Sequence, residues 1–198
     1  MADRFDSFAA LEAGTRRGAD WELRAVDRES DVAVIAPHGG TIEPATAEIA
    51  EAIAGEDLSF YAFEALRAGA HGDYHITSHR FDEPEALALV GRARSTVALH
   101  GRKDDGTETV WLGGRDTALR DAVGEALRGA GFEAEVMGDL PGVHETNICN
   151  RTRTGGGVQL ELPMVLRRAL LDDRERMAAF AGAVRRAIAA GGESVGGE

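Results

Sequence analysis

Two histidines stand directly after apolar segments of the chain, and a glutamate follows closely on one of them, in a pattern typical of a zinc site. His38 and Glu43 share the segment His-Gly-Gly-Thr-Ile-Glu, and His100 ends the segment Val-Ala-Leu-His. Two neutral imidazoles and one carboxylate, with a fourth position left to water, hold catalytic zinc in several hydrolytic enzymes. Because Cys149 is the only cysteine, no cysteine pair can serve instead. A single histidine after a strand is usually a capping or packing residue, but the two together predict a Zn²⁺ site.

Glu161 is the predicted catalytic carboxylate. Zinc lowers the pKa of its bound water to about 7, and a further carboxylate is needed to take the proton. In the segment Val-Gln-Leu-Glu-Leu-Pro at 158–163, the apolar residues share one strand face, and Gln159 and Glu161 share the other. The alternative is that Gln159 and Glu161 form the solvated face of an edge strand.

The sequence contains four other histidines that could bind the metal instead. His71, His75 and His79 have the spacing of a helical stripe, but a Gly-Asp pair follows His71 and an extended segment follows that. Residues four apart on an extended chain lie about 13 Å apart, so these three cannot share one ion. We expect surface or packing roles for His71 and His75, and contact with substrate for His79. His144 is a reserve ligand in case His100 does not bind the metal.

Short β-branched apolar runs alternate with helical patterns, and this alternation predicts the fold. Strands are expected at 31–37, 58–63, 74–77, 95–99, 109–112, 132–136 and 158–162, and helices at 45–54, 84–93, 116–130 and from 163 to 191. Such alternation requires a sheet covered on both faces, and the neighbouring strands around 95–112 indicate that some run antiparallel. We predict an α/β three-layer sandwich with a mixed, mostly parallel open sheet.

Ligands of such sheets bind beyond the carboxyl ends of the strands, which is where His38 and His100 stand. Pro44 keeps Glu43 out of the helical region, so the next helix begins after Glu43. The long segment 138–157, rich in Pro, Gly, Asn and Arg, is expected to be either functional or disordered.

Length and charge limit the classes of protein that remain. The 198 residues suit one domain spanning 1–198, and no apolar stretch is long enough to cross a membrane. The net charge of −12 disfavours a nucleic-acid partner. The opening residues have no secretory signal, so we expect a cytoplasmic protein. Lys103 is the only lysine, which with the acidic surplus indicates a salt-loving host; GC-rich codons explain the arginine excess equally well but not the surplus of acid.

Four segments, in this order, resemble the poly-γ-glutamate hydrolase family. They are His-Gly-Gly-Thr-Ile-Glu at 38–43, Ser-His-Arg-Phe-Asp-Glu-Pro at 78–84, Ala-Leu-His-Gly at 98–101 and Gly-Gly-Gly-Val-Gln-Leu-Glu-Leu at 155–162. The family comprises small proteins from bacteriophages and microbial genomes, some labelled phage-related replication proteins. The resemblance implies a zinc enzyme with a carboxypeptidase-like sheet that cleaves γ-glutamyl amide bonds. It places the metal ligands at His38, Glu43 and His100 and the catalytic carboxylate at Glu161.

A γ-glutamyl substrate is anionic because it carries free α-carboxylates, which guanidinium groups bind with paired hydrogen bonds. The candidates for this contact are Arg80, Arg151 and Arg153, with His79 beside them. Two alternatives remain open: a zinc amidase or deacylase acting on a small N-acyl amino acid, and a non-catalytic phage-derived binding protein. The sequence does not fix the oligomeric state.

Overall fold

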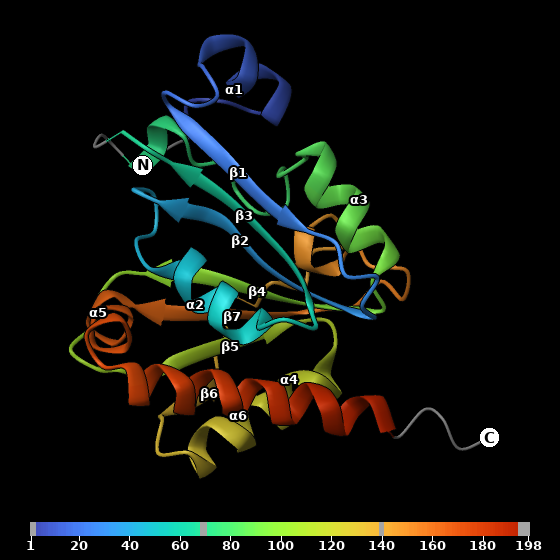
Figure 1. Ribbon diagram of the computed structural model, residues 1–198, viewed down its shortest axis with the longest axis vertical. Helices are drawn as coiled ribbons and strands as arrows, with labels where there is room; N and C mark the ends of the chain where they lie inside the picture. Colours follow the sequence, from blue (N-terminus) through green and yellow to red (C-terminus); the bar gives the residue numbers. More distant parts are fainter. Residues whose placement is uncertain (1–2, 68–70, 139–140, 194–198) are drawn as a thin grey trace.

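Seven strands form one sheet in the computed structural model, which describes residues 3–67, 71–138 and 141–193. The order across the sheet is β1-β3-β2-β4-β7-β5-β6 (Figure 1). The strands are β1 (Trp21–Val26), β2 (Val32–Gly40), β3 (Ser59–Ala65), β4 (Ser95–Arg102), β5 (Val110–Gly114), β6 (Ala134–Val136) and β7 (Val158–Pro163). Only the β1–β3 and β5–β7 pairs are antiparallel. The predicted mixed, mostly parallel sheet is therefore confirmed.

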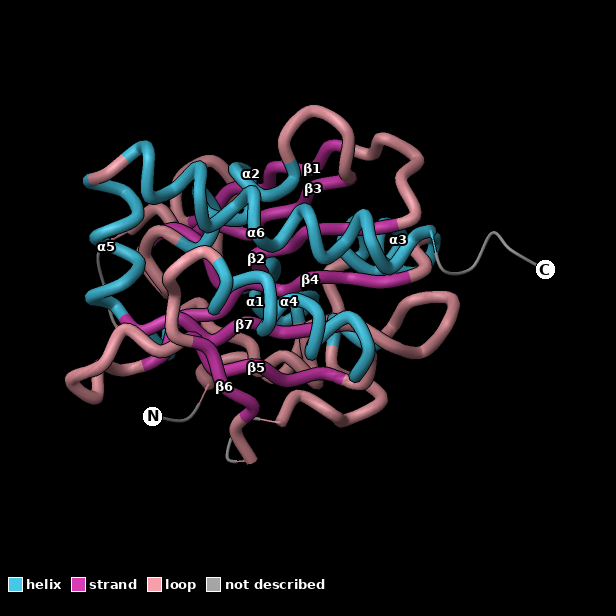
Figure 2. The backbone as a smooth tube through the Cα atoms, turned by 90° about the horizontal axis from the view of Figure 1, so that it is seen from below, coloured by secondary structure: helices cyan, strands magenta, loops and turns pink. Residues whose placement is uncertain are grey.

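Helices cover both faces of this sheet and complete the three layers (Figures 1 and 2). They are α1 (Phe8–Gly14), α2 (Thr46–Ala54), α3 (Pro84–Arg92), α4 (Thr117–Gly129), α5 (Met164–Asp172) and α6 (Arg174–Glu193), with short 3₁₀ helices η1 (His71–Asp73) and η2 (Ile148–Asn150). One apolar core lies between the sheet and α2, α4, α5 and α6, and the other lies under α1, α3 and η2. Among the described residues, none of these helices combines the length and apolarity that crossing a membrane requires.

Alternation along the central strands divides their side chains between the two cores. In β2, Val34 and Ala36 face the core of α2 and α6, whereas Ala33 and Ile35 face the core of α1 and α3. A strand buried on both faces must be apolar throughout, which explains why the sequence predicts β2 well.

Three details differ from the expected elements. The chain has α1 and β1, which no expected element covered, and residues 74–77 are not a strand. There the main-chain nitrogen of Thr77 donates to the Asp3 carboxylate, so a side chain takes the place of a neighbouring strand. The long C-terminal helix is two helices, because Asp173 is extended and its carboxylate accepts from the first main-chain nitrogens of α6.

Candidate metal and catalytic site

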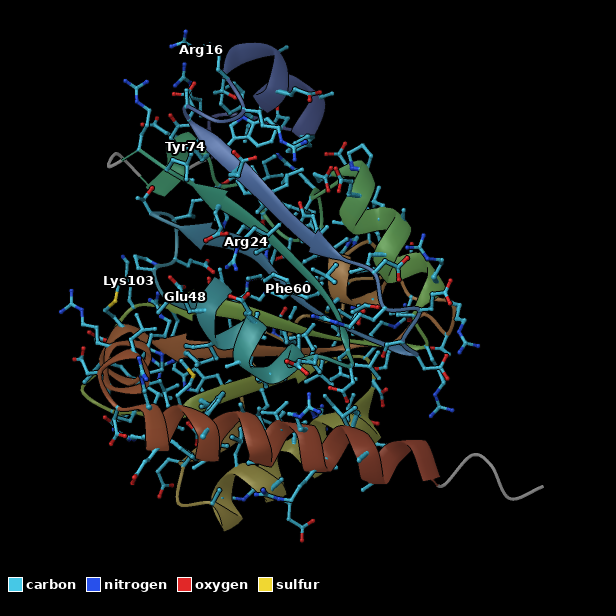
Figure 3. All side chains as sticks on the ribbon, viewed as in Figure 1. Arg16, Arg24, Glu48, Phe60, Tyr74 and Lys103 are labelled. Carbon is cyan, nitrogen blue, oxygen red and sulfur yellow. The ribbon has the colours of Figure 1, made fainter. Side chains whose placement is uncertain are left out.

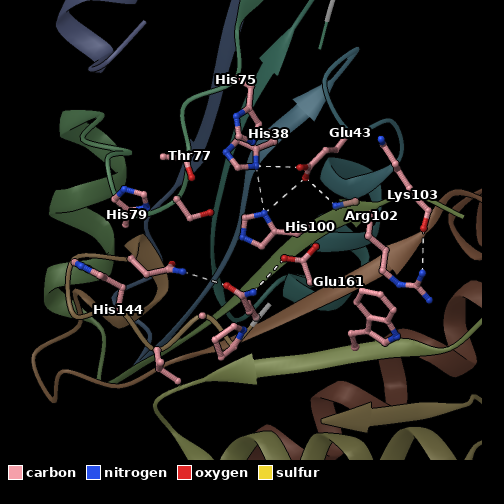
Figure 4. A pocket seen from close by; sticks show the side chains of 18 residues that line it. His38, Glu43, His75, Thr77, His79, His100, Arg102, Lys103, His144 and Glu161 are labelled. Atoms are coloured by element: carbon pink, nitrogen blue, oxygen red, sulfur yellow. Dashed lines mark hydrogen bonds and ion pairs between the residues drawn. The ribbon is translucent and has the colours of Figure 1, made fainter. Parts of the chain in front are cut away.

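A cavity of about 810 Å³ opens at the carboxyl ends of β2, β4 and β7 (Figure 4). The segments 75–79 and 141–147 form its other walls. All three predicted metal ligands line this cavity. It is also lined by Glu161, His79 and His144. The edge of the sheet that the topology favours for ligands therefore carries the candidate site.

A bulge in β2 turns His38 toward this cavity. Ala36 pairs with Ala62 of β3 and Gly39 pairs with Glu64, so β2 has one more residue than β3 in this interval. The extra residue reverses the alternation: Ala36 faces the core of α2, but His38 packs against Phe81 in the core of α3. Without the bulge, His38 would lie on the opposite face of the sheet from the cavity.

Glu43 lies in the turn between β2 and α2 and faces back toward His38. Its main-chain nitrogen donates to the His38 carbonyl at 2.8 Å, which closes the turn. Its Oε1 lies 3.2 Å from His38 Nδ1, and its Oε2 accepts from the Gly101 nitrogen at 2.8 Å. Burial raises the pKa of Glu43, but His38 and His100 outweigh burial and lower that pKa far below its ordinary value. Glu43 is thus an ionised carboxylate held between two imidazoles.

His100 lies on β4, opposite Glu161 of β7 in the sheet register. Its Nδ1 is 3.2 Å from His38 Nδ1 and 3.6 Å from Glu43 Oε2. Burial lowers the pKa of His100, but the hydrogen bond to Glu43 and the charge of Glu161 raise it above its ordinary value. Its Nε2 is buried and has no hydrogen-bond partner in the described part of the chain. The two imidazoles and the carboxylate therefore converge, and one ring nitrogen of His100 is left without a hydrogen bond among the described residues.

The spacing of these donor atoms fits a zinc ion. Donors at zinc–nitrogen distances of 2.0–2.1 Å in a tetrahedral site lie about 3.3 Å apart. The two imidazole Nδ1 atoms lie 3.2 Å apart, and Glu43 offers a different oxygen to each of them, Oε1 at 3.2 Å from His38 and Oε2 at 3.6 Å from His100. His38 Nε2 donates to the Ile76 carbonyl at 2.8 Å, so its Nδ1 carries the lone pair that a metal needs.

His75 joins this cluster, although the sequence assigned it a surface or packing role. Its ring lies 4.2 Å from the His38 ring, and His38, Glu43 and His75 each offer a donor atom within 4.8 Å of the others. Its Nδ1 lies 2.6 Å from the Asp3 carboxylate. Burial lowers the pKa of His75 to about 4, so the ring is neutral near neutral pH. The side chain of His71 lies outside the described part of the structure.

Glu161 lies beside the cluster and is only 9% exposed. Its Oε1 accepts from Gln159 Nε2 at 3.1 Å, and Gln159 in turn accepts from Asn147 Nδ2 (Figure 4). Burial raises the pKa of Glu161, as does the charge of Glu43, although the histidines oppose this. Since β7 lies between β4 and β5, the alternative of a solvated edge strand is wrong.

Of the segment 138–157, residues 139–140 lie outside the described part of the structure, and residues 141–147 form part of the cavity wall. The side-chain amide of Asn150 donates to the carbonyls of Gly142 and His144. His79 and His144 face one another across 5.4 Å between ring centres. His144 lines the cavity on the far side from His100 in Figure 4.

The three candidate arginines lie outside the cavity. Arg80 pairs with Asp6 at the surface, and Arg151 donates to a main-chain carbonyl of the preceding loop. Arg153 pairs with Asp31, which precedes β2 and therefore lies at the opposite end of the sheet. Of the predicted substrate contacts, the structure brings only His79 into the cavity.

The lysine and arginine that do line the cavity are Arg102 and Lys103. Arg102 pairs with Asp105 at 3.0 Å, stacks 3.8 Å from the Trp111 ring centre and donates to the Thr109 carbonyl at 2.8 Å. Lys103 is exposed at the end of the sheet that carries α5 (Figure 3). Their sequence signal was the segment His-Gly-Arg-Lys, in which two cations follow directly on a candidate ligand.

The fold and the site define an α/β protein with an open mixed sheet and a cluster of histidine and carboxylate side chains at its carboxyl edge that could hold a metal ion. The family model described as poly-gamma-glutamate hydrolase matches residues 5–181. The chain therefore belongs to the poly-gamma-glutamate hydrolase family.

Individual relatives agree with this assignment. A bacteriophage poly-gamma-glutamate hydrolase superposes with a TM-score of 0.90 at 29% identity, over 95% of this chain and 97% of the other. The zinc-free apo form of YNDL superposes with a TM-score of 0.86 at 31% identity, over 94% and 97%. The SPbeta prophage-derived protein YoqZ of Bacillus subtilis strain 168 is 34% identical over 86% of this chain. The match spans 62% of the length of YoqZ.

Proposed function

We propose that this protein is a zinc-dependent hydrolase that cleaves γ-glutamyl amide bonds of poly-γ-glutamate. The observation that carries the proposal is the convergence of His38, Glu43 and His100 beside the buried Glu161, with the two imidazole nitrogens 3.2 Å apart and a Glu43 oxygen 3.2–3.6 Å from each. Membership of the family and the likeness to a bacteriophage poly-gamma-glutamate hydrolase support the substrate. The zinc-free form of a similar structure supports the metal.

Glu161 is the proton carrier in the proposed reaction. A zinc ion held by His38, Glu43 and His100 would supply a Lewis acid that acidifies water and stabilises the oxyanion. Glu161 takes the proton of the attacking water and returns it to the departing amine. Its raised pKa suits both steps, and the hydrogen bond from Gln159 fixes the carboxylate toward His100.

Recognition of the substrate carboxylates is assigned to the cationic side of the cavity. Each γ-linked glutamate carries a free α-carboxylate, and Arg102 and Lys103 are the described arginine and lysine that line the cavity. His79 stands on another wall and is available for a polar contact with the neighbouring unit. Arg80, Arg151 and Arg153 lack this access.

The test is hydrolysis by the zinc-loaded protein, followed by the chain length of the polymer and by release of new amino groups. Poly-γ-glutamate and a set of N-acyl amino acids are compared at equal bond concentration. The proposal expects cleavage of the polymer that a chelator abolishes and zinc restores. Release of amines from N-acyl amino acids alone would instead show a small-molecule amidase, and no release from any substrate would show a binding protein.

A further inference from the structure

Arg167 carries a buried guanidinium group directly behind the candidate site. It lies on α5, which begins where β7 ends (Figure 1), and the residue is only 3% exposed. In the described part of the chain, no carboxylate lies within ion-pair distance of it. Its Nε donates to the Leu162 carbonyl at 3.1 Å, and its Nη1 donates to the Pro44 carbonyl.

The plane of the guanidinium also lies against the main chain of Gly101. A Cβ atom at this position would lie 2.6 Å from Arg167 Cζ and 2.8 Å from each Nη. A side chain at position 101 and the guanidinium therefore cannot occupy the space together. The φ angle of Gly101 is not in the left-handed region, so the close approach of Arg167, and not backbone strain, requires glycine here.

The three residues that Arg167 touches have one property in common. Pro44, Gly101 and Leu162 each directly follow a residue of the site, namely Glu43, His100 and Glu161. These segments come from three separate parts of the chain, the turn before α2 and the ends of β4 and β7. One planar side chain thus contacts all three segments.

A buried cation without a close counter-ion is costly, so its retention needs a reason. Burial lowers the pKa of Arg167, while the charges of Glu43, Asp104 and Glu161 raise it. The rigid fork of a guanidinium directs donors to two carbonyls at fixed angles, which the single ammonium of lysine does not. Fixed geometry is also what a metal site requires of the residues that support its ligands.

We propose that Arg167 is a positioning residue that sets the relative placement of Glu43, His100 and Glu161 by holding the residue that follows each. The effect of Arg167 that we expect on turnover rests on the proposed function. The effect that we expect on zinc binding is independent of the substrate.

The first experiment compares Arg167→Met and Arg167→Lys with the matched control Arg168→Met, whose side chain is exposed on the same helix. Zinc affinity is measured by competition with a chelator, and unfolding is measured on the zinc-free proteins. Loss of a supporting contact of this kind lowers metal affinity or activity about 10–100-fold. We expect both Arg167 variants to lose zinc affinity and kcat in this range, with little change in KM. Arg168→Met should lose neither.

A purely structural role predicts a different result. The Arg167 variants would then unfold at lower temperature but would retain zinc affinity and kcat at a temperature where they are folded. That outcome, or full rescue by Arg167→Lys, would overturn the proposal. If the wild-type protein binds zinc but cleaves no polymer, the proposed substrate fails, and the zinc affinities still test Arg167.

A second experiment uses the contact with Gly101 and does not depend on Arg167→Met alone. Gly101→Ala forces the guanidinium to move, so this single variant should lose zinc affinity by itself. In the double variant Gly101→Ala/Arg167→Met the added methyl group fills vacated space, so the two losses should not add. Additive losses, or a Gly101→Ala variant with unchanged zinc affinity, would contradict the positioning role.

Discussion

Replacing Glu161 should remove turnover and leave zinc bound, whereas replacing one of the three candidate zinc ligands should remove zinc. Glu161→Gln keeps the size of the side chain and removes the ability to take a proton. We expect turnover to fall by roughly 10²–10⁴, which is the usual contribution of general acid–base catalysis. Zinc content, measured by elemental analysis, should stay as in the wild type, and the exposed Glu145→Gln is the control. Equal loss of zinc and turnover would show that Glu161 is a ligand.

The pKa of Glu161 predicts the direction of the acid limb of the rate profile. Burial raises this pKa above its ordinary value of 4.5. The carboxylate must be ionised to accept a proton, so kcat should be retained at higher pH and lost as pH falls through the pKa of Glu161, which the charge of a bound zinc ion lowers from its value in the metal-free site. Zinc content is measured in the same buffers. A limb that only follows the loss of zinc would contradict the assignment.

Among single residues, the sequence is most informative for those whose position is determined by their neighbours in the sequence. The convergence of His38, Glu43 and His100 could be predicted because each stands beside a glycine or a turn at the end of a buried strand. His75 could not, because Asp3, which holds its ring, lies 72 residues away in the sequence. The same holds for Arg167, whose contacts come from three segments that only the fold brings together.

At the scale of elements, the geometry of the site depends on the bulge that ends β2. Gly40 has a φ of +64°, and a Cβ there would lie 2.2 Å from the Ala65 carbonyl oxygen. We expect Gly40→Ala to lower the free energy of unfolding by about 1–3 kcal/mol or more, because it adds backbone strain to a steric clash. Gly40 follows the bulge and pairs with Ala65, so a displacement here should also move His38, two residues earlier, and weaken zinc binding.

The matched control is Gly91→Ala in α3, where nothing lies within 4 Å of the added methyl group. Because glycine is unfavourable inside a helix, this variant should be neutral or more stable by about 0.5–1 kcal/mol. Urea unfolding of the zinc-free proteins measures both. Equal stability of Gly40→Ala and Gly91→Ala would show that position 40 tolerates a side chain, and unchanged zinc affinity would show that it does not help to orient His38.

The strands in the middle of the sheet could be predicted because burial on both faces demands continuous apolar runs. The peripheral elements could not. In β1, the buried Trp21 and Leu23 alternate with the half-buried Glu22 and Arg24, so the segment has no continuous apolar run. The division between α5 and α6 depends on Asp173 acting as a cap, which apolar periodicity does not reveal.

At the scale of the whole molecule, a net charge of −12 opposes the approach of an anionic polymer. Salt shortens the range of this repulsion, from about 10 Å at 0.1 M to about 3 Å at 1 M. We therefore expect the rate of poly-γ-glutamate cleavage at low substrate concentration to rise with salt. A γ-glutamyl amide of one unit, which is a zwitterion without net charge, is the control, and its rate should change little. A polymer rate that falls over this range would show that local attraction at Arg102 and Lys103 outweighs the overall charge.

The central claim is that His38, Glu43 and His100 hold one zinc ion, and anomalous diffraction at the zinc edge from crystals of the zinc-loaded protein tests it most directly. We predict one strong peak within about 2.0–2.3 Å of a donor atom of each residue, which disappears in His100→Ala. A peak between His79 and His144 instead, or no peak in protein that binds zinc stoichiometrically in solution, would contradict the claim.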